Sequence, residues 1–252
     1  MARYFIEFSY KGTRFQGLQI QQQARTVQGE INKALKIFFR QQIETTTCSR
    51  TDTGVHALQN FLHVDLHGLV EPACLYNLNA ILPEDIVLHA IWPVADQSHA
   101  RFDAIRRSYR YLLYQKKNAF LYETAYFFPF QLDLEKMNQA AALLHDTPTF
   151  EAFAKRHSNT HRYDCSVSFT KWYQEEERIC FEITANRFLR GMVRGLVGTQ
   201  LLIGRGALSM DDWQQILQQP DNQLVNFSVP PQGLYLTKVE FPNAIFSGHL
   251  AK

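Results

Sequence analysis

The sequence lacks any long apolar run. Hydrophobic residues make up 46% of its 252 residues, yet no segment approaches the roughly 20 consecutive apolar residues that a membrane-spanning helix needs. The first eight residues alternate like a strand and contain no apolar core of a secretory signal peptide. The sequence therefore predicts a cytoplasmic protein without a membrane segment, with enough apolar residues for a sizeable core.

Cysteine is scarce and scattered, and the usual cofactor motifs are missing. The four cysteines form no C-x-x-C pair: Cys48, Cys74, Cys165 and Cys180. Neither a disulfide framework nor a zinc site is indicated, which favours a reducing compartment. No glycine-rich phosphate loop and no serine or cysteine nucleophile motif occurs, and His56 and His63 lack the partners of a metal motif. These absences argue against nucleotide-dependent, metal-dependent and acyl-transfer enzymes.

The net charge of +2 does not by itself indicate a nucleic-acid partner. The distribution of charge says more. Residues 99–117 contain six Lys or Arg against one acid, and 155–162 and 186–206 contain three and four with no acid. The acids gather elsewhere, as in residues 175–177. Each stretch alone is typical of solvated surface, but together with the motifs described below they favour a cationic groove on one face, as nucleic-acid binding needs.

Hydrophobic periodicity predicts two halves of similar order, each mixing strands and helices. The expected strands are 3–9, the segment after Asp52, 86–92, 109–114, 167–172, 179–185 and 235–241. The expected helices start at Thr26, Pro72, Asp133, Phe188 and Ser209. The pattern favours an α+β fold with a mainly antiparallel sheet flanked by helices. We expect one subdomain over 1–104 and a second over 105–252.

One carboxylate is placed unusually, between an arginine and a glycine turn. The string is Arg50-Thr51-Asp52-Thr53-Gly54-Val55-His56-Ala57. A carboxylate on a turn beside a cation stays ionised and can serve as a nucleophile or general base. In the alternative interpretation, Asp52 only hydrogen-bonds the backbone of its own turn.

The string resembles the catalytic motif of the TruA family of tRNA pseudouridine synthases, which detach a uracil from its ribose and reattach it through C5. Further blocks match in order along the chain. They are Tyr10-x-Gly12-x-x-Phe15-x-Gly17-x-Gln19, Asn77-x-Asn79-Ala80-x-Leu82-Pro83-x-Asp85-Ile86, His99-Ala100-Arg101-Phe102, Tyr109-Arg110-Tyr111, Met192-Val193-Arg194-x-x-Val197-Gly198 and Gly233-Leu234-Tyr235-Leu236.

The resemblance implies a role for individual residues in a cleft between the two halves. Asp52 would be the catalytic nucleophile, Tyr109 would stack on the target base, and Arg194 would pair with Asp52. Arg50 would contact the RNA backbone. Further candidates for tRNA binding are His99, Arg101, Arg107 and Arg110.

The family further implies uridines 38, 39 and 40 of the tRNA anticodon stem-loop as targets, a homodimer, and no metal or other cofactor. Three departures from the family pattern, at Leu18, Thr53 and Ser108, remove no catalytic group, and Leu18 and Ser108 bear on RNA contacts. Two alternatives stay open: a pseudouridine synthase acting on another RNA site, and an RNA-binding paralogue without turnover.

Overall fold

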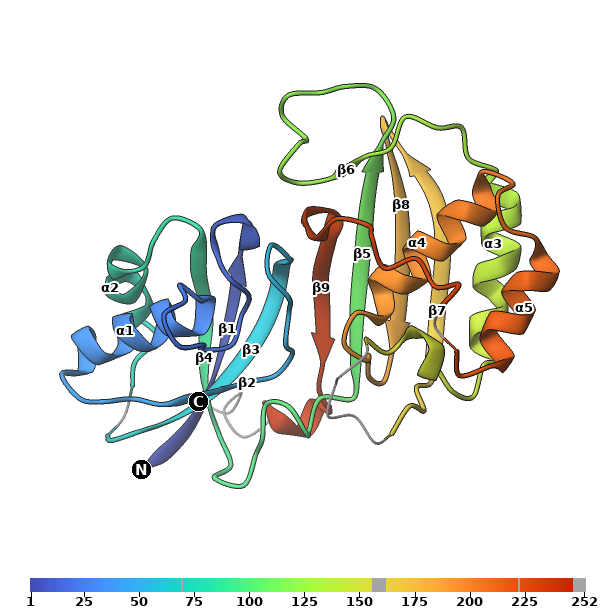
Figure 1. Cartoon of the computed structure of the whole chain (residues 1–252). Helices are drawn as coiled ribbons and strands as arrows, with labels where there is room; N and C mark the ends of the chain where they lie inside the picture. Colours follow the sequence, from blue (N-terminus) through green and yellow to red (C-terminus); the bar gives the residue numbers. More distant parts are fainter. Residues whose placement is uncertain (69, 156–161, 222, 247–252) are drawn as a thin grey trace. The chain divides into compact units, whose positions relative to one another are not determined.

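The computed structural model describes residues 1–68, 70–155, 162–221 and 223–246. The chain divides into two compact units (Figure 1). The first comprises residues 1–105 together with the chain from Leu236 onward, and the second comprises residues 106–235. The sequence led us to expect subdomains over 1–104 and 105–252, whereas most of the final strand is grouped here with the first unit.

The first unit is built on strands that pair antiparallel around β1. Its strands are β1 (Ala2–Tyr10), β2 (Thr45–Thr47), β3 (His56–Leu66), β4 (Ile86–Val94) and most of β9 (Leu234–Glu240). They are ordered β4-β1-β3-β9, with β2 also paired to β3. The unit also contains helices α1 (Val27–Phe39) and α2 (Cys74–Ile81) and the short 3-10 helices η1 (Gly12–Arg14) and η5 (Asn243–Ile245).

Helix α1 forms where the sequence predicted it. The Thr26 hydroxyl accepts a hydrogen bond from the Gly29 N–H and so satisfies one of the unpaired donors of the first turn. Val27, Ile31 and Leu35 of its apolar stripe are all buried. Helix α2 starts at Cys74, two residues later than Pro72 suggested.

Strand β3 carries buried side chains on both faces. Leu62 and Val64 are buried on one face, and Phe61 and His63 on the other. The second face is covered by the end of the chain: the Phe241 ring packs edge-on against Phe61, with centroids 5.0 Å apart. Phe241 also contacts Phe5 of β1 at 5.4 Å. The returning segment therefore completes the core of the first unit.

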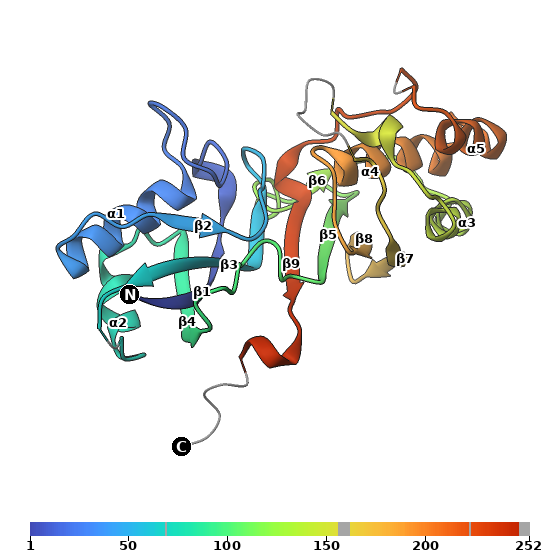
Figure 2. The same cartoon turned by 90° about the horizontal axis from the view of Figure 1, so that it is seen from below.

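The second unit combines an antiparallel sheet, ordered β5-β8-β7, with helices on one side of it (Figure 1 and Figure 2). Its strands are β5 (Arg106–Tyr114), β6 (Tyr126–Phe127), β7 (Val167–Glu175) and β8 (Arg178–Ala185), with β6 parallel to β5. Its helices are α3 (Leu134–Ala142), α4 (Met192–Gly204), α5 (Met210–Gln218) and the 3-10 turns η2 (Leu143–His145), η3 (Glu151–Phe153) and η4 (Pro231–Gly233).

Buried tryptophans tie these layers together. The indole N–H of Trp172, on β7, donates to Oε1 of Gln200 on α4 at 2.8 Å. That of Trp213, on α5, donates to the Ala140 carbonyl on α3 at 3.0 Å. Both rings are almost completely buried. Each buried indole N–H therefore has a hydrogen-bond acceptor on a neighbouring helix.

The predicted helix starts of the second unit are largely confirmed. Asp133 caps α3 by accepting from Lys136 N–H, and Ser209 and Asp212 form a capping box at α5. Helix α4 begins at Met192 rather than at Phe188, because its N-cap Gly191 adopts a left-handed backbone with φ of +78°. In the described part of the chain, no helix has the length and apolar character needed to cross a membrane.

Candidate active site

Asp52 lies on a tight loop between β2 and β3 of the first unit. The Val55 N–H donates to the Asp52 carbonyl at 3.2 Å, which closes a turn through Thr53 and Gly54. Gly54 has a backbone φ of +78°, which residues other than glycine rarely adopt. The turn leaves the Asp52 side chain half-buried and Arg50 exposed. The carboxylate is therefore held by a rigid backbone and remains within reach of solvent.

The end of β1 and the segment that follows it, residues 10–18, contact this loop, and we call them the cradle. The Tyr10 hydroxyl lies 2.7 Å from the Thr51 hydroxyl, one residue before Asp52. The Leu18 N–H donates to the Thr51 carbonyl at 3.2 Å. The Gly12 N–H donates to Nδ1 of His56 at 3.0 Å. These bonds fix both sides of the turn that bears Asp52.

Two glycines let the cradle approach the loop closely. A Cβ on Gly12 would lie 2.0 Å from the Val55 carbonyl oxygen, which is a severe clash with backbone. A Cβ on Gly17 would lie 3.2 Å from the Thr51 carbonyl oxygen, and its φ of +91° already disfavours a side chain. The spacing Tyr10-x-Gly12-x-x-Phe15-x-Gly17 is thus explained by contact with the Asp52 loop.

The base of the loop is fixed by one buried amide. Asn60, on β3, is fully buried. Its Nδ2 donates to the Ser49 carbonyl at 3.1 Å, and its Oδ1 accepts from the Ser49 N–H at 3.4 Å. Sequence reasoning did not single out Tyr10 or Asn60 as site residues. The available signal for Asn60 was an amide next to the apolar pair Phe61 and Leu62 in a predicted strand.

Tyr109 lies on β5 of the second unit, opposite Ile183 of β8. Only 8% of the residue is exposed. The Phe188 ring packs edge-on against the Tyr109 ring at 5.0 Å. The tyrosine is therefore held in one orientation by an aromatic neighbour that the sequence did not assign to the site.

Arg194 lies in the first turn of α4 and is half-buried. Its Nε donates to the Val229 carbonyl at 2.8 Å, and its Nη2 donates to the Phe227 carbonyl at 3.4 Å. An arginine beside an apolar stripe needs such partners. These two bonds fix the guanidinium within its own unit. The predicted pairing with Asp52, a residue of the other unit, stays a prediction.

The segment that holds Arg194 is itself docked on α4. A Cβ on Gly198 would lie 2.0 Å from the Asn226 carbonyl oxygen, so the glycine is needed for this approach. The Asn226 N–H donates to the Thr199 hydroxyl at 3.1 Å, and its side chain donates to the Gly198 carbonyl at 3.3 Å. The carbonyls that accept from Arg194 are therefore rigidly placed.

The predicted RNA-binding residues differ in their surroundings. Arg101 is exposed, and its guanidinium lies over the Phe102 ring, 5.8 Å from the centroid. His99 accepts at Nδ1 from the N–H groups of Arg101 and Phe102. Arg107 donates to the Asn186 carbonyl at 3.0 Å. In the stretch 155–162, residues 156–161 lie outside the described residues.

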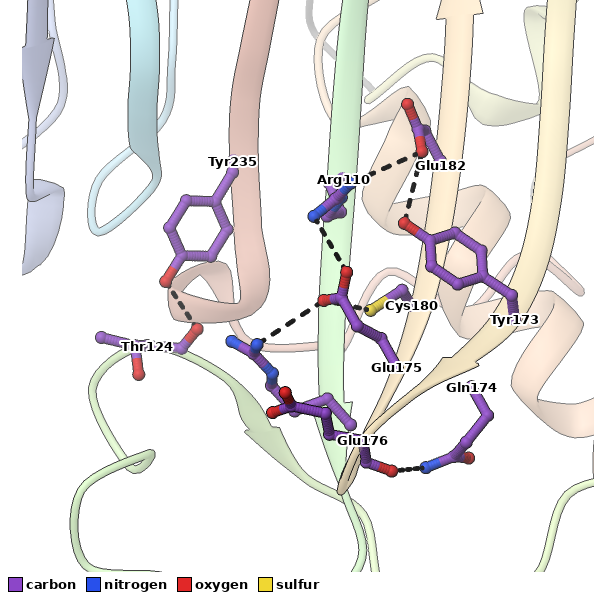
Figure 3. A network of polar contacts seen from close by, with 10 residues as sticks. Arg110, Thr124, Tyr173, Gln174, Glu175, Glu176, Cys180, Glu182 and Tyr235 are labelled. Carbon is purple, nitrogen blue, oxygen red and sulfur yellow. Dashed lines mark hydrogen bonds and ion pairs between the residues drawn. The ribbon is translucent and has the colours of Figure 1, made fainter.

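Arg110 lies in an acidic network on β5, β7 and β8 (Figure 3). Its guanidinium is 3.7 Å from carboxylate oxygens of both Glu175 and Glu182. Arg178 also lies 3.5 Å from Glu175, and the Tyr173 hydroxyl donates to Glu182 at 3.3 Å. Two carboxylates lie close to this arginine, so its charge is less available to a phosphate.

The three departures from the family pattern have different environments. Leu18 is fully buried. Ser108 is buried, and its hydroxyl lies 2.7 Å from the Thr184 hydroxyl. Thr53 is exposed on the Asp52 loop. Leu18 and Ser108 therefore belong to the packing of their own units, and their effect on RNA contacts stays a prediction.

No group of three or more His, Cys, Asp or Glu that could hold a metal ion occurs among the described residues. All four cysteines are buried as free thiols. Burial raises the pKa of Cys165 to about 11 and that of Cys180 to about 12. Such thiols are protonated near neutral pH and are poor nucleophiles.

Comparison with known proteins agrees with this arrangement of motifs. The sequence profile of a family described as tRNA pseudouridine synthase matches residues 140–242. A tRNA pseudouridine synthase A from Parabacteroides distasonis is 39% identical over 248 residues, which cover 98% of each chain. That from Porphyromonas gingivalis is 39% identical over 98% of this chain and 100% of its own.

A more distant relative, the tRNA pseudouridine synthase A of Staphylococcus saprophyticus, is 34% identical over 94% of this chain and 90% of its own. Identity at this level over nearly the whole length shows common ancestry and a common fold. The chain belongs to the tRNA pseudouridine synthase family, within the group of relatives that carry the name tRNA pseudouridine synthase A.

Proposed function

We propose that this protein isomerises uridine to pseudouridine in the anticodon stem-loop of tRNA, at positions 38, 39 and 40, with Asp52 as the nucleophile. The observation that carries the proposal is the Asp52 loop. Its neighbours Thr51 and His56 are held by hydrogen bonds with Tyr10, Gly12 and Leu18, while Asp52 itself is half-buried. A rigid, accessible carboxylate is what covalent catalysis on a large substrate requires.

The reaction conserves every atom of the nucleotide. The N1–C1′ bond breaks and a C5–C1′ bond forms, while C5 loses a proton and N1 gains one. Asp52 would supply the electron pair that captures the nucleotide during this exchange. Because the base must leave its stack, which costs a few kcal/mol, a stacking partner is also needed. Tyr109, held edge-on by Phe188, is our candidate for that partner.

We further propose that Arg194 pairs with Asp52, since a guanidinium and a carboxylate attract each other. Arg50 would contact the RNA backbone. The wider tRNA surface would include Arg101, His99 and Arg107, with Arg110 in a lesser role because of its two carboxylate neighbours. We place the protein in the cytoplasm, as a homodimer.

Release of the C5 proton provides a direct assay. Transcribed tRNA labelled with tritium at C5 of uridine should release tritium to water when the purified protein is added. Primer extension after carbodiimide treatment should place the product at positions 38–40. Asp52→Asn is the control, because its amide is nearly isosteric but cannot act as an anionic nucleophile.

Each outcome separates one interpretation from another. Tritium release that maps to other positions would show a different target site. Tight tRNA binding without release would show an RNA-binding paralogue. If Asp52→Asn retained activity within tenfold of the wild type, Asp52 would not be the nucleophile.

A further inference from the structure

An exposed aromatic ring lies on the turn between β4 and β5 in the first unit. Phe102 is 74% exposed. Its ring packs against the imidazole of His99, with centroids 4.2 Å apart and planes 31° apart. The Arg101 guanidinium lies 5.8 Å from the same ring centroid. An aromatic ring, an imidazole and a cation thus form one small surface, which we call the Phe102 platform.

The turn that carries the platform is held by its own hydrogen bonds. The His99 N–H donates to Oδ2 of Asp103 at 2.7 Å, and the His99 carbonyl accepts from the N–H groups of Phe102 and Asp103. Nδ1 of His99 also accepts from the Arg101 and Phe102 N–H groups. The exposed ring is therefore displayed by a rigid turn and does not lie on a loose loop.

The platform is also anchored to the core. Ala100 is fully buried, and its N–H donates to Nδ1 of His63 on β3 at 3.1 Å. The His63 and His99 rings meet edge-on at 4.6 Å. Because His63 is seven residues along β3 from His56, this anchor lies about 23 Å from the end of the strand next to the Asp52 loop. The platform is thus remote from the reacting uridine.

We propose that the Phe102 platform is a second tRNA contact, at which an unpaired base of the substrate stacks on Phe102 beside Arg101. This inference rests on the proposed function for the identity of the RNA. Single-stranded bases bind proteins by stacking on aromatic rings, with arginine adding a cationic contact. A rigid ring loses little conformational freedom on binding, which favours affinity.

A remote contact has a distinctive kinetic signature. It contributes equally to the ground state and the transition state, so its loss raises KM and leaves kcat unchanged. Loss of one stacked base lowers affinity by about 5- to 150-fold. This separates the platform from Asp52 and Tyr109, whose substitution should lower kcat.

The test compares Phe102→Leu with Phe102→Trp. Leucine keeps an apolar side chain but has no π face, whereas tryptophan keeps and enlarges it. Tyr76→Leu is the matched control, since Tyr76 is an aromatic residue of the same unit with 82% exposure. Binding of full-length tRNA and tritium release are measured for each variant, with the melting temperature as a check on folding.

We expect Phe102→Leu to raise Kd and KM at least 5-fold at unchanged kcat, while Phe102→Trp and Tyr76→Leu stay within twofold of the wild type. The additional fluorescence of the Phe102→Trp variant should be quenched when tRNA is added. If Phe102→Leu binds tRNA like the control, or if both substitutions at 102 weaken binding equally, the platform is not a stacking site.

The same experiment distinguishes this failure from that of the proposed function. If the wild-type protein releases tritium and Phe102→Leu behaves like the Tyr76→Leu control, only the platform proposal fails. If Phe102→Leu weakens tRNA binding but the wild-type protein releases no tritium, the platform proposal holds and the catalytic proposal fails. A change in sedimentation of Phe102→Leu at unchanged tRNA affinity would assign the ring to a protein contact and overturn the inference.

Discussion

The hydroxyl of Tyr10 lies 2.7 Å from that of Thr51, and so connects the end of β1 to the residue that precedes Asp52. Both side chains are buried. Burial raises the pKa of Tyr10 well above its ordinary value, while its hydrogen bonds to Thr51 and Asn60 act in the opposite direction. The phenol is therefore a neutral hydrogen-bonding group, and its role is to position the Asp52 loop.

Replacing Tyr10 by phenylalanine should test this positioning role. The ring remains, but the buried Thr51 hydroxyl loses its partner, which costs about 1–3 kcal/mol of unfolding free energy. A loop that moves even slightly should also lower kcat more than it raises KM. Denaturant unfolding and tritium release, with Tyr10→Phe, Thr51→Val and the double variant, measure the coupling. Additive effects would show that the two hydroxyls do not act together.

Gly12→Ala should be far more damaging than its single added methyl suggests. The new Cβ would lie 2.0 Å from the Val55 carbonyl oxygen, so either the cradle or the Asp52 loop must move. We expect a loss of at least about 1–3 kcal/mol, as in overpacked cores, together with most of the activity. Gly68→Ala is the comparison for a substitution without steric contact: nothing lies within 4 Å of its Cβ position, so only its φ of +77° opposes the added methyl. Equal melting temperatures and activities for the two variants would contradict the close approach.

Arg194→Met should destabilise the second unit as well as lower activity. Methionine keeps the apolar stem but leaves the Val229 and Phe227 carbonyls without a donor, at a cost of about 1–3 kcal/mol. The control is Arg205→Met, which removes an exposed guanidinium 3.7 Å from the Phe130 ring centroid. Such a contact is worth only about 0.5–1 kcal/mol. If Arg194→Met melts at the same temperature as the control or higher, the hydrogen bonds of Arg194 do not stabilise the second unit.

His63 should make stability fall in mild acid. Burial lowers its pKa to about 4, with help from Arg3 and His99, while Asp65 and Asp103 oppose the shift. The unfolded chain, with a histidine pKa of about 6.5, gains a proton before the folded chain does. This contribution is therefore present above about pH 6.5 and is lost as the pH falls towards 4.

His63→Asn isolates that contribution. An amide oxygen can replace Nδ1 as acceptor for the Ala100 N–H, but it does not titrate. Urea unfolding at several pH values should show a shallower decline from pH 6.5 to 4 for the variant than for the wild type, even if its stability at pH 7 is lower. Parallel declines would show that His63 does not drive the acid sensitivity.

Local sequence signals predicted most of the elements because they depend on neighbouring residues. The caps at Thr26, Asp133 and Ser209 formed as expected, since each needs only a side chain and the first turn of its helix. The hairpin of β7 and β8 followed from alternation and an acidic turn. The delayed start of α4 reflects the backbone conformation of Gly191, which the apolar pattern does not report.

The interactions that position the candidate site were harder to predict because they join residues far apart in the sequence. Asp52 was evident from its motif, but the clamp by Tyr10 and Gly12 depends on the pairing of β1 with β3. Arg194 was expected from the family resemblance, but its carbonyl partners come from Phe227 and Val229, more than 30 positions further along the chain. Arg110 belonged to a basic stretch in the sequence, and its acidic neighbours come from two other strands.

The path of the chain has a consequence for how the protein is made. The first unit includes β9 from Leu236 onward, where the Val239 N–H donates to Oε1 of Gln59 at 3.0 Å and Phe241 covers Phe61. Residues 106–235 are continuous, so a ribosome delivers that whole unit before it delivers the last strand of the first one. During synthesis the first unit, which bears Asp52, is completed only after this last strand has been made. A nascent protein truncated after Tyr235 would therefore expose the incomplete core of its N-terminal half to chaperones and proteases.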